Sequence, residues 1–253
     1  MGRRNVLGRT PKYELALHVH ACRVEEHVIL LDIKRDQYLG LSAPLAIALT
    51  FEVHGWPPDN PTSAVKPHER MDDAVLNTIE WLKNEGVVIE SPIKPVPRVP
   101  ICIPRPAFGL FENCKNAPAN VRFSSLVNVL ATSIQVSLCL RCLSLERTLF
   151  RLQRHRLNVA PTKDHPTPEE QDQLRTHVVA FRALRPLAIA ARSPCLFESL
   201  ALGEFLASQG LFPRIVFGVD ANPFAAHCWL QWDDVVINDS PEYVSRFTPI
   251  MVI

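Results

Sequence analysis

The sequence lacks the features that define several large functional classes. Its formal net charge is only +1, from 27 basic and 26 acidic residues, so broad binding to nucleic acid or to membrane surfaces is not expected. There is no Walker-type loop and no GxGxxG motif, and we therefore identify no cofactor site. Cys139 and Cys142 form a CxxC pair without a second pair at zinc-ligand spacing, so we predict no metal site.

Signals for export or membrane insertion are also weak. Three arginines near the N-terminus are not followed by an apolar segment, which argues against a secretory signal. The longest apolar stretch, Leu126 to Leu140, contains several polar residues and predicts a buried or amphipathic helix, so we expect no membrane span. Seven cysteines, an odd number without secretory context, indicate a reducing compartment, and we expect a cytoplasmic protein.

The composition does support two folded domains. Hydrophobic residues make up 47% of the 253 positions, which is enough to bury more than one core. Six prolines stand between Ser91 and Pro106, and such a composition favours a semi-rigid, extended spacer. We therefore predict domains at residues 1–90 and 107–253, joined by a Pro-rich linker at 91–106.

Near the C-terminus, a cysteine occupies the position that a nucleophile requires. Cys195 follows Ser193-Pro194 and precedes an apolar run with helical spacing that stops at Gly210. The cysteine is thus predicted to open a helix, with Ser193 as the N-cap. Unpaired N–H groups and the helix dipole at that position favour a thiolate.

A histidine and an aspartate follow in two predicted strands. His227 lies in the alternating segment 224–232, and Asp239 ends a second strand at 235–239, with Asp233-Asp234 as the turn. Adjacent antiparallel strands can bring His227 and Asp239 together. We predict that Cys195 attacks a carbonyl carbon, that His227 transfers the proton and that Asp239 orients the imidazole. A buried structural thiol and a structural histidine are the alternative interpretation.

These three residues stand in segments that resemble a known family. The segments are CLFESLALGEFLASQGLFPRIVFGV, PFAAHCWLQW and VVINDSPEYVSRFTPI. They are similar to the leader-peptidase domain of the B proteins of lasso peptide biosynthesis, which has a transglutaminase-like, papain-like fold. The resemblance implies that Cys195, His227 and Asp239 form the catalytic triad of a cysteine peptidase. Cys228 stands where that family more often has Ala.

The first 90 residues predict strands followed by helices. The segment 13–20 alternates as a strand, and 27–33 with 37–41 predicts a hairpin. Helices are predicted at 43–53, capped by Ser42, and at 71–85. This order resembles the PqqD-like precursor-recognition domain, a winged-helix-like module that binds a leader peptide as an added strand. Four prolines disfavour that family's middle helix at 55–68.

The same resemblance implies a set of residues that contact the leader peptide. Backbone hydrogen bonds of an added strand would give affinity, and alternate side-chain pockets would give register. The alternative is that these strand and helix residues belong to the core. The matching positions are Tyr38, Leu39, Leu41, Leu76, Ile79 and Trp81.

The sequence therefore predicts an α+β protein with an N-terminal PqqD-type domain and a C-terminal transglutaminase-like cysteine peptidase domain. Its expected function is to bind the leader of a ribosomally made lasso precursor and to cleave it from the core. The resemblance also implies a partner, an asparagine-synthetase-like cyclase that uses ATP to close the lactam. Two other functions fit the same residues: a transglutaminase-like acyltransferase or amidase, and a non-catalytic scaffold that presents the precursor.

Overall fold

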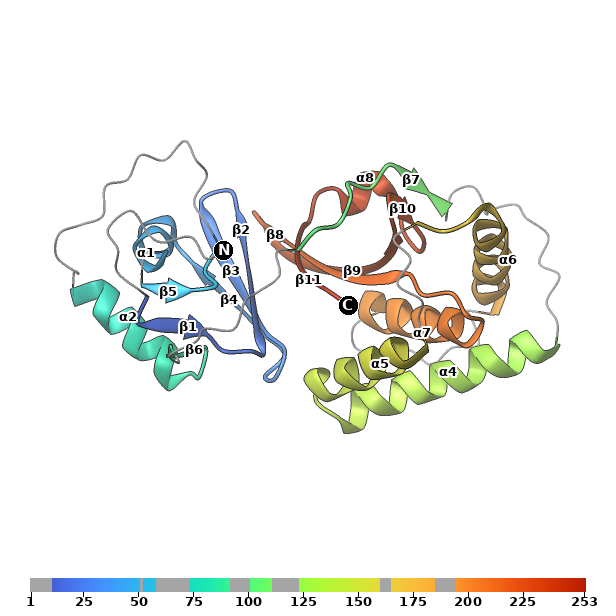
Figure 1. Ribbon diagram of the computed structural model, residues 1–253, viewed down its shortest axis with the longest axis horizontal. Helices are drawn as coiled ribbons and strands as arrows, with labels where there is room; N and C mark the ends of the chain where they lie inside the picture. The colour runs from blue at the N-terminus through green and yellow to red at the C-terminus, as the bar shows by residue number, and fades with distance from the viewer. Residues whose placement is uncertain are drawn as a thin grey trace. The chain divides into compact units, whose positions relative to one another are not determined.

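The computed structural model describes residues 11–50, 52–57, 73–91, 101–110, 123–159, 165–184 and 194–253 (Figure 1). The chain divides into two compact units, Met1–Pro100 and Ile101–Ile253. Most of the segment with the disfavoured middle helix, and residues 92–100 of the predicted linker, lie outside the described residues.

The described residues of the first unit form two small sheets and two helices. In one sheet, with strand order β5-β1-β6, the central strand pairs parallel with β5 and antiparallel with β6. The other sheet is an antiparallel meander with the order β2-β3-β4. The strands are β1 (Tyr13–Leu15), β2 (Val19–Val24), β3 (His27–Asp32), β4 (Gln37–Leu41), β5 (Val53–His54) and β6 (Val88–Glu90), and the helices are α1 (Ala43–Leu49) and α2 (Asp73–Asn84).

The predicted hairpin of this unit is confirmed as β3 and β4, but two other predictions need correction. The segment 13–20 is two strands, because a turn closed by the Val19 N–H and the Ala16 carbonyl (2.9 Å) separates them. Helix α1 ends at Leu49, because Val53 leaves the helical path and forms strand β5, where it pairs with Tyr13 of β1.

The core of the first unit lies between these sheets and the two helices. Helix α2 buries Val75, Ile79 and Leu82, which recur at the i, i+4, i+7 spacing of one helical face. The helix ends at Asn84, and the turn that follows has Gly86 at a left-handed φ of 67°, after which the Val87 N–H donates to the Leu82 carbonyl (2.9 Å). This ending turns the chain into β6, beside β1.

The second unit is built on a five-stranded sheet with the order β11-β8-β9-β10-β7. Neighbouring strands are antiparallel except β10 and β7, which are parallel. The long β8–β9 hairpin forms the centre of the sheet, and the predicted strand at 224–232 is confirmed as β9. The strands are β7 (Phe108–Gly109), β8 (Arg214–Ala221), β9 (Phe224–Trp232), β10 (Val235–Val236) and β11 (Thr248–Val252).

Helix α7 is the central helix of this unit. It is apolar on all sides, and nearly every residue from Phe197 to Ala207 is buried, as expected for a helix enclosed by other elements. One side of α7 packs on β9 and another on α4, with α6 also in contact (Figure 1). The helices are α4 (Phe123–Cys142), α5 (Leu145–Val159), α6 (Pro168–Leu184), α7 (Pro194–Ser208) and α8 (Pro241–Val244).

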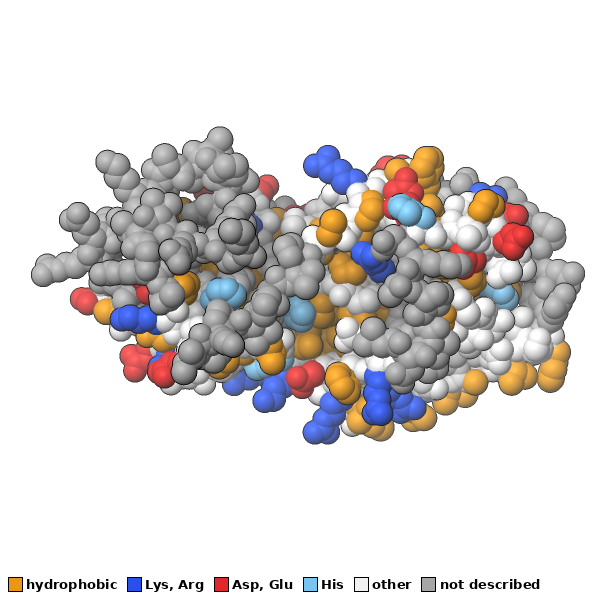
Figure 2. Space-filling view, in the orientation of Figure 1, with side chains coloured by type: hydrophobic (Ala, Val, Ile, Leu, Met, Phe, Trp, Pro, Cys, Tyr) orange, Lys and Arg blue, Asp and Glu red, His pale blue; other side chains and the backbone are white. Residues whose placement is uncertain are grey.

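Helix α4 is one described helix that is long and apolar enough to cross a membrane, by length and composition only. A core helix of a soluble protein passes the same test. Val129 and Val136 on one face are buried, whereas Phe123, Ile134 and Leu138 are exposed on the other. Figure 2 shows apolar side chains along this exposed edge. The absence of a membrane span stays a prediction.

The second unit begins earlier than residue 107, where the sequence predicted its start. The Cys102 carbonyl accepts a hydrogen bond from Arg214 (3.1 Å), and the Pro104 carbonyl accepts one from the buried Gln231 side chain (2.8 Å). The Ala107 N–H donates to the Asp234 carbonyl (2.8 Å). Residues 101–106 therefore belong to the folded unit, because carbonyl groups in a Pro-rich segment still accept hydrogen bonds from the sheet.

Candidate active site

The start of helix α7 places a thiol beside strand β9. Cys195 is the second residue of α7, directly after Pro194, and its side chain is half-buried. The predicted helix start is confirmed, whereas the predicted cap, Ser193, lies outside the described residues. The first N–H groups of a helix have no partners within that helix, so they can bind an anion at this position.

The three residues predicted from the sequence come together in the structure. His227, on β9, contacts Asp239 through Nε2 and Oδ2 at 2.7 Å, and it also forms a side-chain hydrogen bond with Cys195. Because Nε2 faces the carboxylate, Nδ1 is the ring nitrogen left for the thiol. This order of thiol, imidazole and carboxylate is the arrangement that activates a cysteine nucleophile.

Asp239 reaches His227 because strand β10 stops early. The sequence predicted a strand through Asp239, but β10 ends at Val236, and beyond it the Ile237 N–H still donates to the Leu230 carbonyl (2.9 Å). If the pairing of Val235 with Trp232 continued in register, Asp239 would lie opposite Cys228 and its side chain would be on the other sheet face from His227. The bend after Val236 brings the carboxylate to the face of the histidine.

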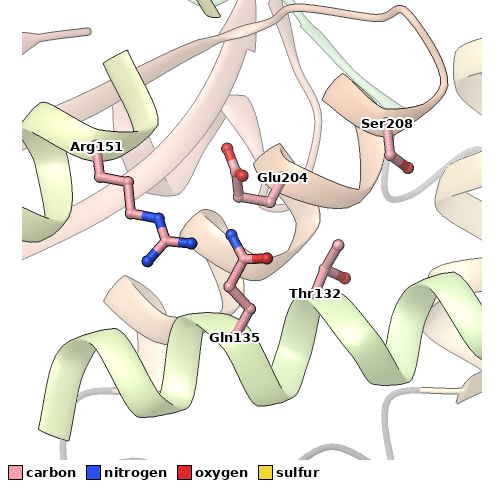
Figure 3. Close-up of a pocket in the computed structure, with 5 residues that line it drawn as sticks. All are labelled: Thr132, Gln135, Arg151, Glu204 and Ser208. Atoms are coloured by element: carbon pink, nitrogen blue, oxygen red, sulfur yellow. The ribbon is translucent and has the colours of Figure 1, made fainter. Parts of the chain in front are cut away.

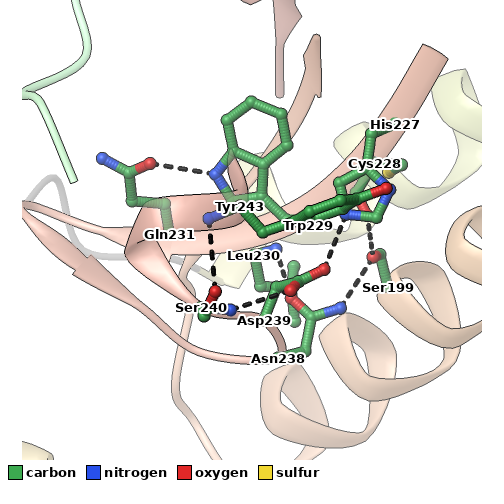
Figure 4. Close-up of polar contacts among 10 residues, drawn as sticks. All are labelled: Ser199, His227, Cys228, Trp229, Leu230, Gln231, Asn238, Asp239, Ser240 and Tyr243. Carbon is green, nitrogen blue, oxygen red and sulfur yellow. Dashed lines mark hydrogen bonds and ion pairs between the residues drawn. The ribbon is translucent and has the colours of Figure 1, made fainter. Parts of the chain in front are cut away.

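The side chain of Asn238 replaces a backbone acceptor that is lost where β10 ends (Figure 4). The Leu230 N–H, which a regular ladder would pair with the Ile237 carbonyl, instead donates to Asn238 Oδ1 at 2.7 Å. Asn238 Nδ2 donates to Ser199 Oγ at 2.9 Å, and Ser199 Oγ donates to the Cys228 carbonyl at 2.8 Å. The sequence patterns pointed to neither Asn238 nor Ser199, although Asn238 directly precedes Asp239 and Ser199 lies one helical turn after Cys195.

An aromatic cluster surrounds the imidazole. The ring centroid of His227 lies 5.1 Å from that of Tyr243, 5.2 Å from that of Phe247 and 6.1 Å from that of Trp229. Gly218 pairs directly with His227, and a Cβ at this glycine would lie 2.6 Å from the Trp229 ring. The glycine therefore makes room for the indole that packs beside the imidazole.

The electrostatics of the site favour a charged imidazole. Burial by itself lowers the pKa of His227, but the hydrogen bonds and charges of Asp239 and Cys195 raise it from 6.5 to about 9. The neighbouring thiol differs, because burial raises the pKa of Cys228 far above its ordinary value. Burial likewise raises the pKa of Cys22, in the first unit, to about 12. These two thiols are held neutral.

The predicted leader-contacting residues divide into buried and accessible side chains. Leu41 and Ile79 lie in the core of the first unit, with exposed fractions of 7% and 3%, so their side chains pack inward as the alternative interpretation expected. Leu76 and Trp81 on α2 are both 44% exposed. The remaining two, Tyr38 and Leu39 on β4, are half-buried.

A separate pocket lies between α4, α5 and α7, with a volume of about 320 Å³. In Figure 3 the side chains of Arg151, Gln135 and Glu204 point into the space between these helices. Glu204 is nine residues along α7 from Cys195, a distance of roughly 13 Å at the helical rise. Thr132 and Ser208 complete the lining, and no triad residue contributes to it.

Comparisons with known proteins agree with the geometry of the second unit. Residues 139–252 match the family model of the transglutaminase-like superfamily, a range that includes all three triad positions. The second unit therefore contains a transglutaminase-like domain. The microcin J25-processing protein McjB of Escherichia coli is 36% identical over 59 residues, which are 23% of this chain and 28% of that protein. The match thus covers less than a third of the length of this relative. No solved structure matches the present chain.

Proposed function

We propose that this chain is a lasso peptide maturation protease, which cleaves the leader from a ribosomally made precursor. The observation that carries the proposal is a hydrogen-bonded series in which His227 joins Asp239 to Cys195, the residue at the start of a buried helix. The transglutaminase-like match and the partial similarity to a microcin-processing protein support it. Such a triad cleaves an amide by nucleophilic catalysis.

The geometry suggests a role for each group in the reaction. The thiolate of Cys195, paired with the His227 imidazolium, attacks the carbonyl carbon of the scissile bond. The N–H groups at the start of α7 can donate to the developing oxyanion. His227 then gives its proton to the leaving amine of the core peptide, and water hydrolyses the thioester to release the leader. Asp239 holds the imidazole in the required tautomer throughout.

The first unit would recognise the leader by strand addition, as a PqqD-like module does. Among the described strands, β4 stands at the edge of its sheet, so its outer backbone groups can pair with a peptide. An ion pair between Arg35, in the β3–β4 turn, and Glu85, directly after α2, links the two elements that carry the predicted contacts. Leu76 and Trp81 offer apolar surface on α2.

The product of this cleavage would be a core peptide with a free amine. We further propose that an asparagine-synthetase-like cyclase in the cytoplasm receives this core and closes the lactam with ATP. The precursor itself is expected to be a short peptide encoded beside the gene of this chain and beside a cyclase gene.

The test is to incubate the purified chain with that neighbouring precursor peptide and to follow the products by mass spectrometry. We expect the wild-type protein to cut the precursor at one bond and to release two fragments. The Cys195→Ala variant should bind the leader as well as the wild type does but should not cut the precursor. An acyltransferase would instead join an added primary amine to the peptide. A scaffold would bind the leader, leave it intact, and support cyclisation equally well with Cys195→Ala. Either result would contradict the peptidase assignment.

A further inference from the structure

Three polar groups connect the chain segments that carry the triad: Ser199 and the carbonyl of Cys228 are buried, and Asn238 is half-buried. Ser199 lies one helical turn after Cys195 on α7, Asn238 directly precedes Asp239, and the Cys228 carbonyl directly follows His227. The bonds from Asn238 Nδ2 to Ser199 Oγ (2.9 Å) and from Ser199 Oγ to the Cys228 carbonyl (2.8 Å) join all three segments (Figure 4).

We propose that Asn238 and Ser199 are positioning residues, which keep the Asp239 carboxylate on the His227 side of the sheet. This inference rests on the proposed peptidase function and concerns the same site. Without the Asn238 side chain as acceptor for the Leu230 N–H, the regular β10–β9 ladder would extend and would turn Asp239 toward the opposite face. The amide therefore replaces one backbone acceptor and so permits the bend.

The burial of Ser199 at the centre of this network makes its hydrogen bonds hard to replace. Ser199 is fully buried, at 0% exposure, so water cannot replace a lost partner there. A hydroxyl has a single proton to donate, and Ser199 donates it to the Cys228 carbonyl, while the Cys228 side chain also lies within hydrogen-bond reach of the Ser199 hydroxyl. Loss of the hydroxyl would leave the amide N–H and the carbonyl without this partner and would loosen the bend.

Two substitutions separate positioning from simple packing. Ser199→Ala removes the hydroxyl with almost no change in volume. Asn238→Asp keeps the acceptor for the Leu230 N–H but removes the donor to Ser199. The matched control is Ser133→Ala on α4, because Ser133 is equally buried, at 1%, and its hydroxyl has no hydrogen-bond partner among the described residues.

The first readout does not require a peptide substrate. The rate of Cys195 alkylation by iodoacetamide is measured against pH, with mass spectrometry to separate this thiol from the others. A misplaced carboxylate holds the His227 imidazolium less well, so we expect the alkylation midpoint to rise by about one pH unit in both variants. The second readout is cleavage of the neighbouring precursor peptide, where kcat should fall by roughly 10- to 100-fold with KM unchanged.

The outcomes distinguish this inference from the proposed function. The positioning role is supported if the alkylation midpoint rises and kcat falls in Ser199→Ala and Asn238→Asp, while Ser133→Ala keeps the wild-type values. Folded variants that keep the wild-type alkylation profile would overturn it, even if their melting temperatures fall, because the network would then be only structural. If the wild type does not cleave the precursor but the alkylation midpoint still shifts, the peptidase assignment fails and the positioning role stands. If Asn238→Asp does not fold, Ser199→Ala decides the matter.

Discussion

Replacing Asp239 by Asn tests the electrostatic basis of the site most directly. The substitution removes the negative charge 2.7 Å from His227 Nε2 and keeps the size of the side chain. In the wild type, burial acts to lower the pKa of His227, and the interactions with Asp239 and Cys195 overcome it and raise the pKa from 6.5 to about 9. That difference corresponds to about 3 kcal/mol in favour of the imidazolium. It is an upper value, because Asp239 is 27% exposed and partly screened by solvent.

The sign of the pH dependence follows from the raised pKa. A histidine whose folded pKa lies above its unfolded value stabilises the fold fully below pH 6.5, and this stabilisation is lost as the pH rises through about 9. Asp239→Asn removes the negative charge that counteracts the effect of burial, so the pKa of His227 should fall well below the wild-type value. The free energy of unfolding should then depend less on pH across this window.

The assay is an NMR titration of the His227 ring, assigned by comparison with His227→Gln. Asp234→Asn is the control, because Asp234 lies in the turn before β10 and the side chains that act on the imidazole are those of Asp239 and Cys195. We expect the His227 titration to move only in Asp239→Asn, with cleavage slowed and leader binding unchanged. The reasoning is refuted if His227 titrates near 6.5 in the wild type or if Asp239→Asn leaves its titration unchanged.

Three other predictions concern packing, thiol chemistry and domain organisation. Gly218→Ala should lower the free energy of unfolding by about 1–3 kcal/mol through overpacking against the indole, whereas Gly203→Ala, whose added Cβ meets its nearest neighbour at 3.5 Å, should be neutral in the same urea denaturation. Cys195 should be alkylated before Cys228 in a timed labelling experiment, and the reverse order would remove the basis for the nucleophile assignment. Isothermal titration should show that residues 1–100 bind the leader peptide. Residues 101–253 should cut the precursor slowly, because they bind this substrate more weakly without the first unit. If only residues 101–253 bind the leader, the first unit is not the recognition module.

Local patterns in the sequence were enough to predict the elements that carry Cys195 and His227. Apolar residues at helical spacing after Pro194 predicted helix α7, and the alternating stretch at 224–232 predicted strand β9. Such patterns depend on neighbours a few residues apart, so they can be read without knowledge of the fold. The Pro-rich segment likewise indicated two units, although it misplaced the start of the second, because hydrogen bonds to distant strands decide where a linker ends.

Only the tertiary structure decided how Asp239 meets His227. The pattern of 235–239 predicts a continuous strand, in which the carboxylate would be on the wrong face of the sheet. The bend depends on Asn238, whose partners Leu230 and Ser199 lie 8 and 39 residues away in the chain. Periodicity specifies which residues share a face of one element, whereas contacts between elements specify where that element ends. Here the early end of β10 allows Asp239 to contact His227.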